Sequence, residues 1–158
     1  MLDLAAGGGR HTALLREAGL SVLAVDREIG ALEARFAGDP GVQCQAVDLE
    51  TGVPWPIGGG FAGIVVTNYL HRPLLPALVE ALAAGGVLIY ETFMRGNERF
   101  GRPSNPDFLL APGELLAAFA ALAPIAFEQG VVDAPRAAAI QRIAAVKAAA
   151  ESIALPAR

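Results

Sequence analysis

The sequence predicts an α/β protein built around a mostly parallel sheet. Short apolar runs alternate with stretches of helical periodicity along most of the chain, which is the pattern of repeated strand–helix–strand units. The length of 158 residues is that of one domain. With 54% apolar and 18% charged residues, the chain can bury a substantial core. We therefore expect a single domain over residues 1–158.

The first half of the chain contains the clearest strand–helix units. Strands are predicted over residues 2–4, 21–25 and 42–47, and helices over residues 10–18 and 29–37. Glycine follows each helix directly, as is typical of helix C-termini. Residues 52–60, with two prolines and three consecutive glycines, form a loop.

The second half continues the pattern and then departs from it. We expect a strand over residues 61–67, a helix over 74–84 ended by two glycines, and a strand over 87–93. Residues 94–112 contain three prolines and show no period. A loop of that length is uncommon as a plain connector and is often a lid. A further helix is predicted from Pro112 to about Leu122.

The C-terminal segment supports two interpretations. Residues 125–132 are predicted as a strand and residues 133–136 as a turn. The composition of residues 137–150 favours a helix, whereas their alternation fits a strand weakly. If they form a strand, a connection of about four residues requires an antiparallel hairpin, because parallel crossovers need a dozen residues or more.

Charge and composition exclude several classes of function. A formal charge of −4 disfavours binding to the phosphate backbone of nucleic acids. One cysteine and two histidines predict neither a disulfide nor a metal site. The most apolar stretch, residues 115–127, is shorter than the ~20 residues of a membrane span, and no signal peptide precedes it. We expect a cytoplasmic protein without membrane or nucleic-acid partners.

A glycine-rich turn near the N-terminus is the strongest candidate for a binding site. The sequence from Leu2 to His11 reads LDLAAGGGRH, a strand that runs into glycines and then into a helix. Such a turn lets the backbone approach a ligand closely, and the helix N-terminus offers free N–H groups.

Acidic residues stand where successive strands end. Asp3 lies just before the glycine turn, and Asp26 and Asp48 follow the second and third strands. Because the carboxyl ends of parallel strands meet at one edge, these acids are expected to share one crevice. Asp26 is also placed where a carboxylate commonly binds a ribose diol.

Two nucleotide-like ligands compete for this site. A nicotinamide dinucleotide normally requires Gly-x-Gly-x-x-Gly/Ala, but Thr12 occupies the third position here. An acid before the glycines suits a ligand that carries an ammonium group. S-adenosylmethionine, an amino acid joined to ribose and adenine, matches Asp3, Asp26 and Asp48 in that order.

These motifs, with Val25-Asp26, Val47-Asp48-Leu49 and Gly85-Gly86-Val87-Leu88-Ile89, resemble the class I S-adenosylmethionine-dependent methyltransferases. Within them the chain is similar to the small-substrate group that includes the tellurite-resistance methyltransferases. The resemblance implies a Rossmann-like three-layer sandwich whose seven-stranded, mostly parallel sheet ends in an antiparallel hairpin. It therefore favours a strand within residues 137–150. Family members normally carry a helix and a full strand before Asp3, so that helix and part of the first strand are expected to be missing here.

The resemblance also implies roles for individual residues. Asp3 would polarise the methionine end, and Gly7 and Gly9 would wrap the methionine and ribose portion, with Ala5 at the first glycine position of the motif. Asp26 would bind the ribose and Asp48 the adenine, with Leu49 beside the ring, and Arg27 is a further cofactor-binding candidate. Asn68 matches the position nearest the sulfonium, and the aromatic face of Tyr69 could lie against the sulfonium or the adenine. Asn68 and Tyr69 are therefore also candidate catalytic residues. His71 is the candidate general base. No residue is predicted to bind a metal.

The predicted activity is methyl transfer from S-adenosylmethionine to a small-molecule or unidentified acceptor, with S-adenosylhomocysteine as product. Two alternatives remain open. The first is a module that binds S-adenosylmethionine or S-adenosylhomocysteine without catalysis. The second is an NAD(P)-binding oxidoreductase. The sequence does not determine the oligomeric state.

Overall fold

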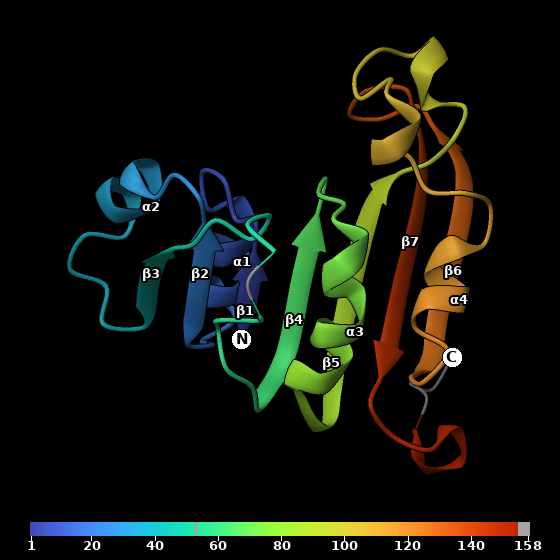
Figure 1. Ribbon diagram of the computed structural model, residues 1–158. Helices are drawn as coiled ribbons and strands as arrows, with labels where there is room; N and C mark the ends of the chain where they lie inside the picture. Colours follow the sequence, from blue (N-terminus) through green and yellow to red (C-terminus); the bar gives the residue numbers. More distant parts are fainter. Residues whose placement is uncertain (53, 155–158) are drawn as a thin grey trace.

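The computed structural model describes residues 1–52 and 54–154 and contains one seven-stranded sheet (Figure 1). Val53 and residues 155–158 of the expected domain lie outside the described residues. The strand order is β3-β2-β1-β4-β5-β7-β6. All neighbours are parallel except β7, which runs antiparallel to both β5 and β6. The predicted Rossmann-like sheet with a C-terminal hairpin is confirmed.

The parallel strands agree with the apolar runs of the sequence. β1 spans Leu2–Leu4, β2 Val22–Asp26, β3 Val42–Ala46, β4 Phe61–Thr67 and β5 Leu82–Phe93. β1 lies between β2 and β4, and its three residues are all buried. β2 and β4 are largely buried apolar runs, as is typical of strands covered on both faces. β3, with the sequence VQCQA, is an edge strand without a fully buried residue, although its predicted bounds also agree to within two residues.

Short helices connect the strands. α1 spans Arg10–Glu17, α2 Gly30–Arg35, α3 Leu75–Ala81 and α4 Glu114–Ala118. Single 3₁₀ turns cover Arg72–Leu74, Asn97–Arg99, Pro106–Phe108 and Ala150–Ser152. Among the described residues, no helix is long and apolar enough to cross a membrane.

The predicted end of the third helix is wrong. We expected this helix to continue to residue 84 and to end at the glycine pair, but α3 ends at Ala81 and Leu82 is already extended. The glycines lie inside β5, where the pairing with β4 is irregular between Phe61 and Gly63. Glycine inside a strand often accompanies such an irregularity.

Residues 137–150 form a strand rather than a helix over most of their length. β7 spans Ala138–Val146 and pairs in register with both β5 and β6 (Ala123–Val132). On the face of β7 that carries Ile143 and Ala145, the side chains are buried. Pairing with a strand on each side of β7, together with burial of this face, thus outweighs the local preference for helix.

The two faces of the sheet carry different layers. The side chains of Leu88, Tyr90 and Thr92 in β5 are buried, and the Tyr90 ring lies 5.7 Å from that of Phe119, which directly follows α4. α1 lies on the opposite face, where its residue His11 forms a hydrogen bond with Thr67 at the end of β4. This arrangement leaves the carboxyl ends of β1 to β4 at one edge of the sheet.

The loop over residues 94–112 is held to the fold by three polar side chains. Arg72 donates hydrogen bonds to the carbonyl oxygens of Asp107 and Leu109, and it pairs with Glu114. The buried Asn97 donates to the carbonyl of Pro103 and accepts from a β7 amide. The buried Gln141 donates to the carbonyl of Ala111 at 2.5 Å. The loop is therefore anchored at several points along its length.

Candidate functional site

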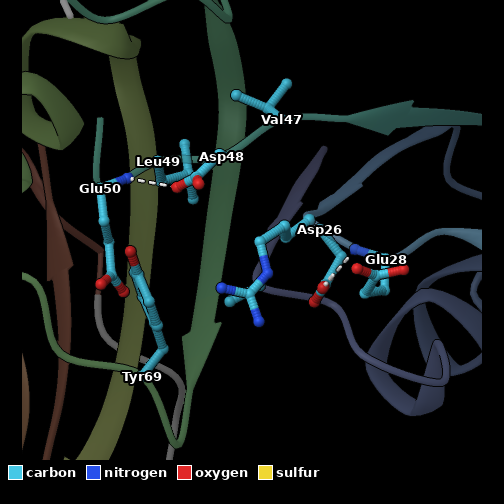
Figure 2. Close-up of a pocket in the computed structure, with 9 residues that line it drawn as sticks. Asp26, Glu28, Val47, Asp48, Leu49, Glu50 and Tyr69 are labelled. Carbon is cyan, nitrogen blue, oxygen red and sulfur yellow. Dashed lines mark hydrogen bonds between the residues drawn. The ribbon is translucent and has the colours of Figure 1, made fainter. Parts of the chain in front are cut away.

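A cavity of about 220 Å³ opens at the carboxyl edge of the parallel strands (Figure 2). We call it the first cavity. The residues that line it follow β1, β2, β3 and β4: Ala5, Asp26, Arg27, Glu28, Val47, Asp48, Leu49, Glu50 and Tyr69. The location agrees with the rule that ligands bind beyond the carboxyl ends of parallel strands. Five of the predicted binding residues (Ala5, Asp26, Arg27, Asp48 and Leu49) and the predicted catalytic residue Tyr69 meet here.

Asp26 connects the cavity to the glycine turn. Its Oδ2 accepts a hydrogen bond from the Gly7 amide at 2.8 Å, and its Oδ1 accepts one from the Glu28 amide at 3.1 Å. A carboxylate has about four acceptor positions. Two backbone amides therefore orient Asp26 and leave it capacity to accept hydrogen bonds from a ligand.

Asp48 and Glu50 form the opposite wall. Asp48 accepts a hydrogen bond from the Glu50 amide at 2.9 Å, which turns the chain directly after β3 (Figure 2). The turn places Leu49 and the Glu50 side chain at the cavity. Glu50 was not predicted from the sequence, because nothing in its local pattern distinguishes it from a solvated loop residue.

Tyr69 carries a buried hydroxyl for which the described residues provide no hydrogen-bond partner. Figure 2 shows this hydroxyl beside the Glu50 carboxylate. Burial, followed by the charge of Glu50, raises the pKa of the phenol above its ordinary value. Hydrogen bonding toward Glu50 also contributes to the raised pKa of the phenol. The Tyr69 hydroxyl can therefore donate either to Glu50 or to a ligand, and burying it unpaired would be unfavourable.

Asp3 does not line the cavity. Its side chain is 1% exposed and accepts a hydrogen bond from the Thr12 hydroxyl at 2.6 Å. Burial raises the pKa of the Asp3 carboxyl above its ordinary value, although the bond from Thr12 opposes this effect. Asp3 lies at the same edge of the sheet as Asp26 and Asp48, but beneath the first turn of α1.

The glycine turn has one position at which only glycine fits. A Cβ on Gly9 would lie 2.5 Å from the Phe36 ring, and the residue has φ of +74°. Around Gly7 and Gly8, in contrast, a Cβ would meet no atom within 4 Å. The turn therefore packs against α2 through Gly9 and leaves open space beside Gly7 and Gly8.

Asn68 and His71 lie away from the first cavity. Asn68 has φ of +55° and lines a second cavity, which it shares with Glu50 and Tyr69. His71 precedes the 3₁₀ turn at Arg72 and lines neither of these cavities. Among the described residues, no three histidine, cysteine or acidic side chains are grouped closely enough to hold a metal ion.

A substitution of Ala5 tests whether the backbone after β1 is strained. Ala5 has φ of 55°, a conformation that costs an L-residue about 1–2 kcal/mol. Changing it to glycine removes this cost, and the greater freedom of glycine in the unfolded chain offsets about 0.5–1 kcal/mol of the gain. We expect Ala5→Gly to leave the free energy of unfolding unchanged or to raise it by up to about 1 kcal/mol. Ala6→Gly, the control without positive φ, should lower it by about 0.5–1 kcal/mol in urea titrations. Equal destabilisation by both changes would contradict strain at Ala5.

Asp3 predicts a pH dependence of stability. Its folded pKa is raised above the ordinary value of 3.8, so the native state binds the proton more tightly than the unfolded chain does. The stability that protonated Asp3 contributes is fully present below the ordinary pKa, and it is lost as the pH rises through the pKa of the folded state. In Asp3→Asn the amide oxygen still accepts from Thr12 and no charge forms. The difference obtained by subtracting the Tm of the parent from the Tm of Asp3→Asn should therefore increase as the pH is raised from 4 to 7. A constant difference between the Tm of Asp3→Asn and that of the parent across this range would refute the raised pKa.

No protein-family model and no curated protein matches the sequence. Solved structures match the fold over 92% of the chain. The match to TehB from Haemophilus influenzae has a TM-score of 0.77 and 16% identity, and it covers 57% of that chain. The match to the N-methyltransferase NodS from Bradyrhizobium japonicum WM9 has a TM-score of 0.70 and 18% identity, and it covers 83% of that chain. The match to an S-adenosylmethionine-dependent methyltransferase from Mesorhizobium loti has a TM-score of 0.69 and 20% identity, and it covers 89% of that chain.

These similarities establish the fold. The chain has the architecture of S-adenosylmethionine-dependent methyltransferases, as its motifs predicted. It spans little more than half the length of TehB.

Proposed function

We propose that this protein transfers a methyl group from S-adenosylmethionine to a small-molecule acceptor and releases S-adenosylhomocysteine. The observation that carries the proposal is the pair of carboxylates, Asp26 and Asp48, that line one cavity at the ends of neighbouring strands. Two proteins of the same fold are described as methyltransferases, and NodS was also solved with S-adenosylhomocysteine. We treat residues 1–158 as one methyltransferase-like domain.

The residues present fit this cofactor. Asp26 keeps acceptor capacity for the two hydroxyl groups of a ribose, and Asp48 for the amino group of an adenine. The unpartnered Tyr69 hydroxyl is a donor at the cavity wall. The space beside Gly7 and Gly8 accommodates an amino-acid portion, and buried Asp3 supports the turn from below through Thr12.

The bound cofactor supplies an activated methyl group with a neutral leaving group. The chain's own contribution is to orient the two reactants and exclude water between them. Asn68 and Tyr69 follow β4, the strand next to β1; Tyr69 lines both cavities, and Asn68 lines the second. We propose that they border the site of transfer. His71 stays a candidate base only if it moves, because it lines neither cavity.

Calorimetric titration with S-adenosylmethionine, S-adenosylhomocysteine and NAD tests the cofactor. Binding of the two sulfur ligands without NAD supports the proposal. NAD binding without a response to S-adenosylmethionine refutes it and favours an oxidoreductase. Transfer of isotope from a methyl-labelled donor to a panel of small amines, alcohols and thiols then distinguishes an enzyme from a binding module.

A further inference from the structure

The second cavity, also about 220 Å³, adjoins the first. Glu50 and Tyr69 line both cavities, so these two side chains form the wall between them. The second cavity lies where β4 and β5 end, next to the anchored loop over residues 94–112. A molecule placed here would therefore lie next to one in the first cavity.

Four polar side chains line the second cavity: Glu50 and Tyr69 at the shared wall, and Asn68 and Thr92 at the ends of β4 and β5. Among the eight described residues that line it, Glu50 is the one that carries a charge, and the others include no base. The Tyr69 hydroxyl lies beside the Glu50 carboxylate and lacks a protein partner among the described residues (Figure 2). The wall therefore combines a negative charge with an aromatic ring, and both attract a cation.

The remainder of the second cavity is largely apolar. Leu70 and Phe93 line it from the ends of the strands, and Pro103 and Phe108 from the loop. Phe108 is 49% exposed, and with Pro103 it continues into a neighbouring hollow. Apolar walls with a few converging polar groups are typical of sites for small organic molecules.

We propose that the second cavity holds the methyl acceptor, and that this acceptor is a small apolar amine whose nitrogen is recognised by Glu50. This inference rests on the proposed function. An anionic acceptor would be repelled by Glu50, and a polyol would meet apolar walls at Leu70, Phe93, Pro103 and Phe108, which offer its hydroxyl groups no partner.

An amine at this wall also accounts for the proton that transfer must release. The bound ammonium first gives one proton to the Glu50 carboxylate, which frees the nitrogen lone pair. The nitrogen then forms a bond to the methyl carbon of a sulfonium donor as the carbon–sulfur bond breaks and its electron pair stays on sulfur. The product leaves as an N-methylammonium ion, and Glu50 releases its proton to water.

The test measures binding in the absence of cofactor, so that its result does not depend on turnover. The probes are 2-phenylethylamine, its neutral analogue 2-phenylethanol and the anion phenylacetate, titrated calorimetrically into the full chain. We expect the amine to bind about tenfold more tightly than the alcohol, as one charge-assisted hydrogen bond allows. Phenylacetate should bind most weakly.

Two variants locate this selectivity. Glu50→Gln should remove the preference for the amine and leave alcohol binding unchanged within about twofold. Phe108→Ala should weaken amine and alcohol by a similar factor and leave their ratio unchanged. Glu98→Gln, in the same loop but outside both cavities, is the control for loss of one negative charge.

Equal affinity for amine and alcohol, or a preference that persists in Glu50→Gln, overturns the inference. Titration of S-adenosylmethionine into the unmodified protein separates the two proposals. If the cofactor binds and the amine does not, the acceptor assignment alone fails. If the amine binds selectively and the cofactor does not, the proposed function fails and the amine site stands.

Discussion

Replacing Asp26 by alanine is expected to weaken the binding of S-adenosylmethionine by about 1–3 kcal/mol, roughly five- to 150-fold in Kd. The change removes a carboxylate that is oriented by the amides of Gly7 and Glu28. It therefore removes the acceptor that we propose for the ribose and also loosens the glycine turn. Calorimetric titration with S-adenosylmethionine measures the affinities of the parent and of Asp26→Ala.

The Asp26 experiment needs two comparisons. Asp26→Asn keeps an oxygen that accepts from the Gly7 amide, so it separates the effect of charge from the order of the turn. Asp133→Ala removes an acid from the exposed turn between β6 and β7, away from the cavity, and should not change the affinity. An Asp26→Ala protein that binds as tightly as the parent removes Asp26 from the site.

Changing Gln141 to leucine should lower the free energy of unfolding by about 2–4 kcal/mol and the Tm by about 5–15 °C. Gln141 is fully buried. Its amide donates to the carbonyl of Ala111, and its oxygen accepts from the amide of Leu115. Leucine has a similar size but leaves both backbone groups buried without partners. Thermal and urea unfolding, followed by circular dichroism, measure the loss.

Gln129 provides a matched control for Gln141. It pairs with Gln141 across β6 and β7, and its oxygen accepts from the Gly113 amide in the same segment. Gln129 is exposed, so water replaces its hydrogen bond when it is lost. Gln129→Leu should change stability by no more than about 0.5 kcal/mol. Similar losses in the two variants would show that burial does not determine the cost.

The acids at the strand ends show how far sequence reasoning reaches. Asp26 closes β2 and Asp48 follows β3, and parallel geometry alone brings their side chains to one cavity. Asp3 differs because it lies inside β1, which has a neighbour on each side. Its side chain therefore turns into the layer beneath α1, where Thr12 meets it. The sequence predicted the shared edge, but the spacing contains no signal for the burial of Asp3.

Long-range contacts account for what the sequence did not reveal. The family resemblance implied a strand in this segment, whereas its local composition favoured a helix. β7 is a strand because β5 and β6 pair with it on both sides. Glu50 meets Tyr69 only after two separate strand ends come together. Gln141 anchors Ala111, 30 positions earlier. Contacts of this kind leave no local periodicity, so they required the structure.

The anchoring of the loop over residues 94–112 has a consequence for diversification. Asn97, Arg72 and Gln141 bind its backbone, and none of the three lines the second cavity. Phe108 faces the cavity from between these attachment points, whereas the carbonyl oxygen of Pro103 is itself the acceptor of the Asn97 bond. Under the acceptor assignment proposed above, substitutions of Phe108 are expected to change acceptor selectivity while the attachments keep the scaffold intact. A library confined to Phe108 therefore tests whether selectivity is separable from folding.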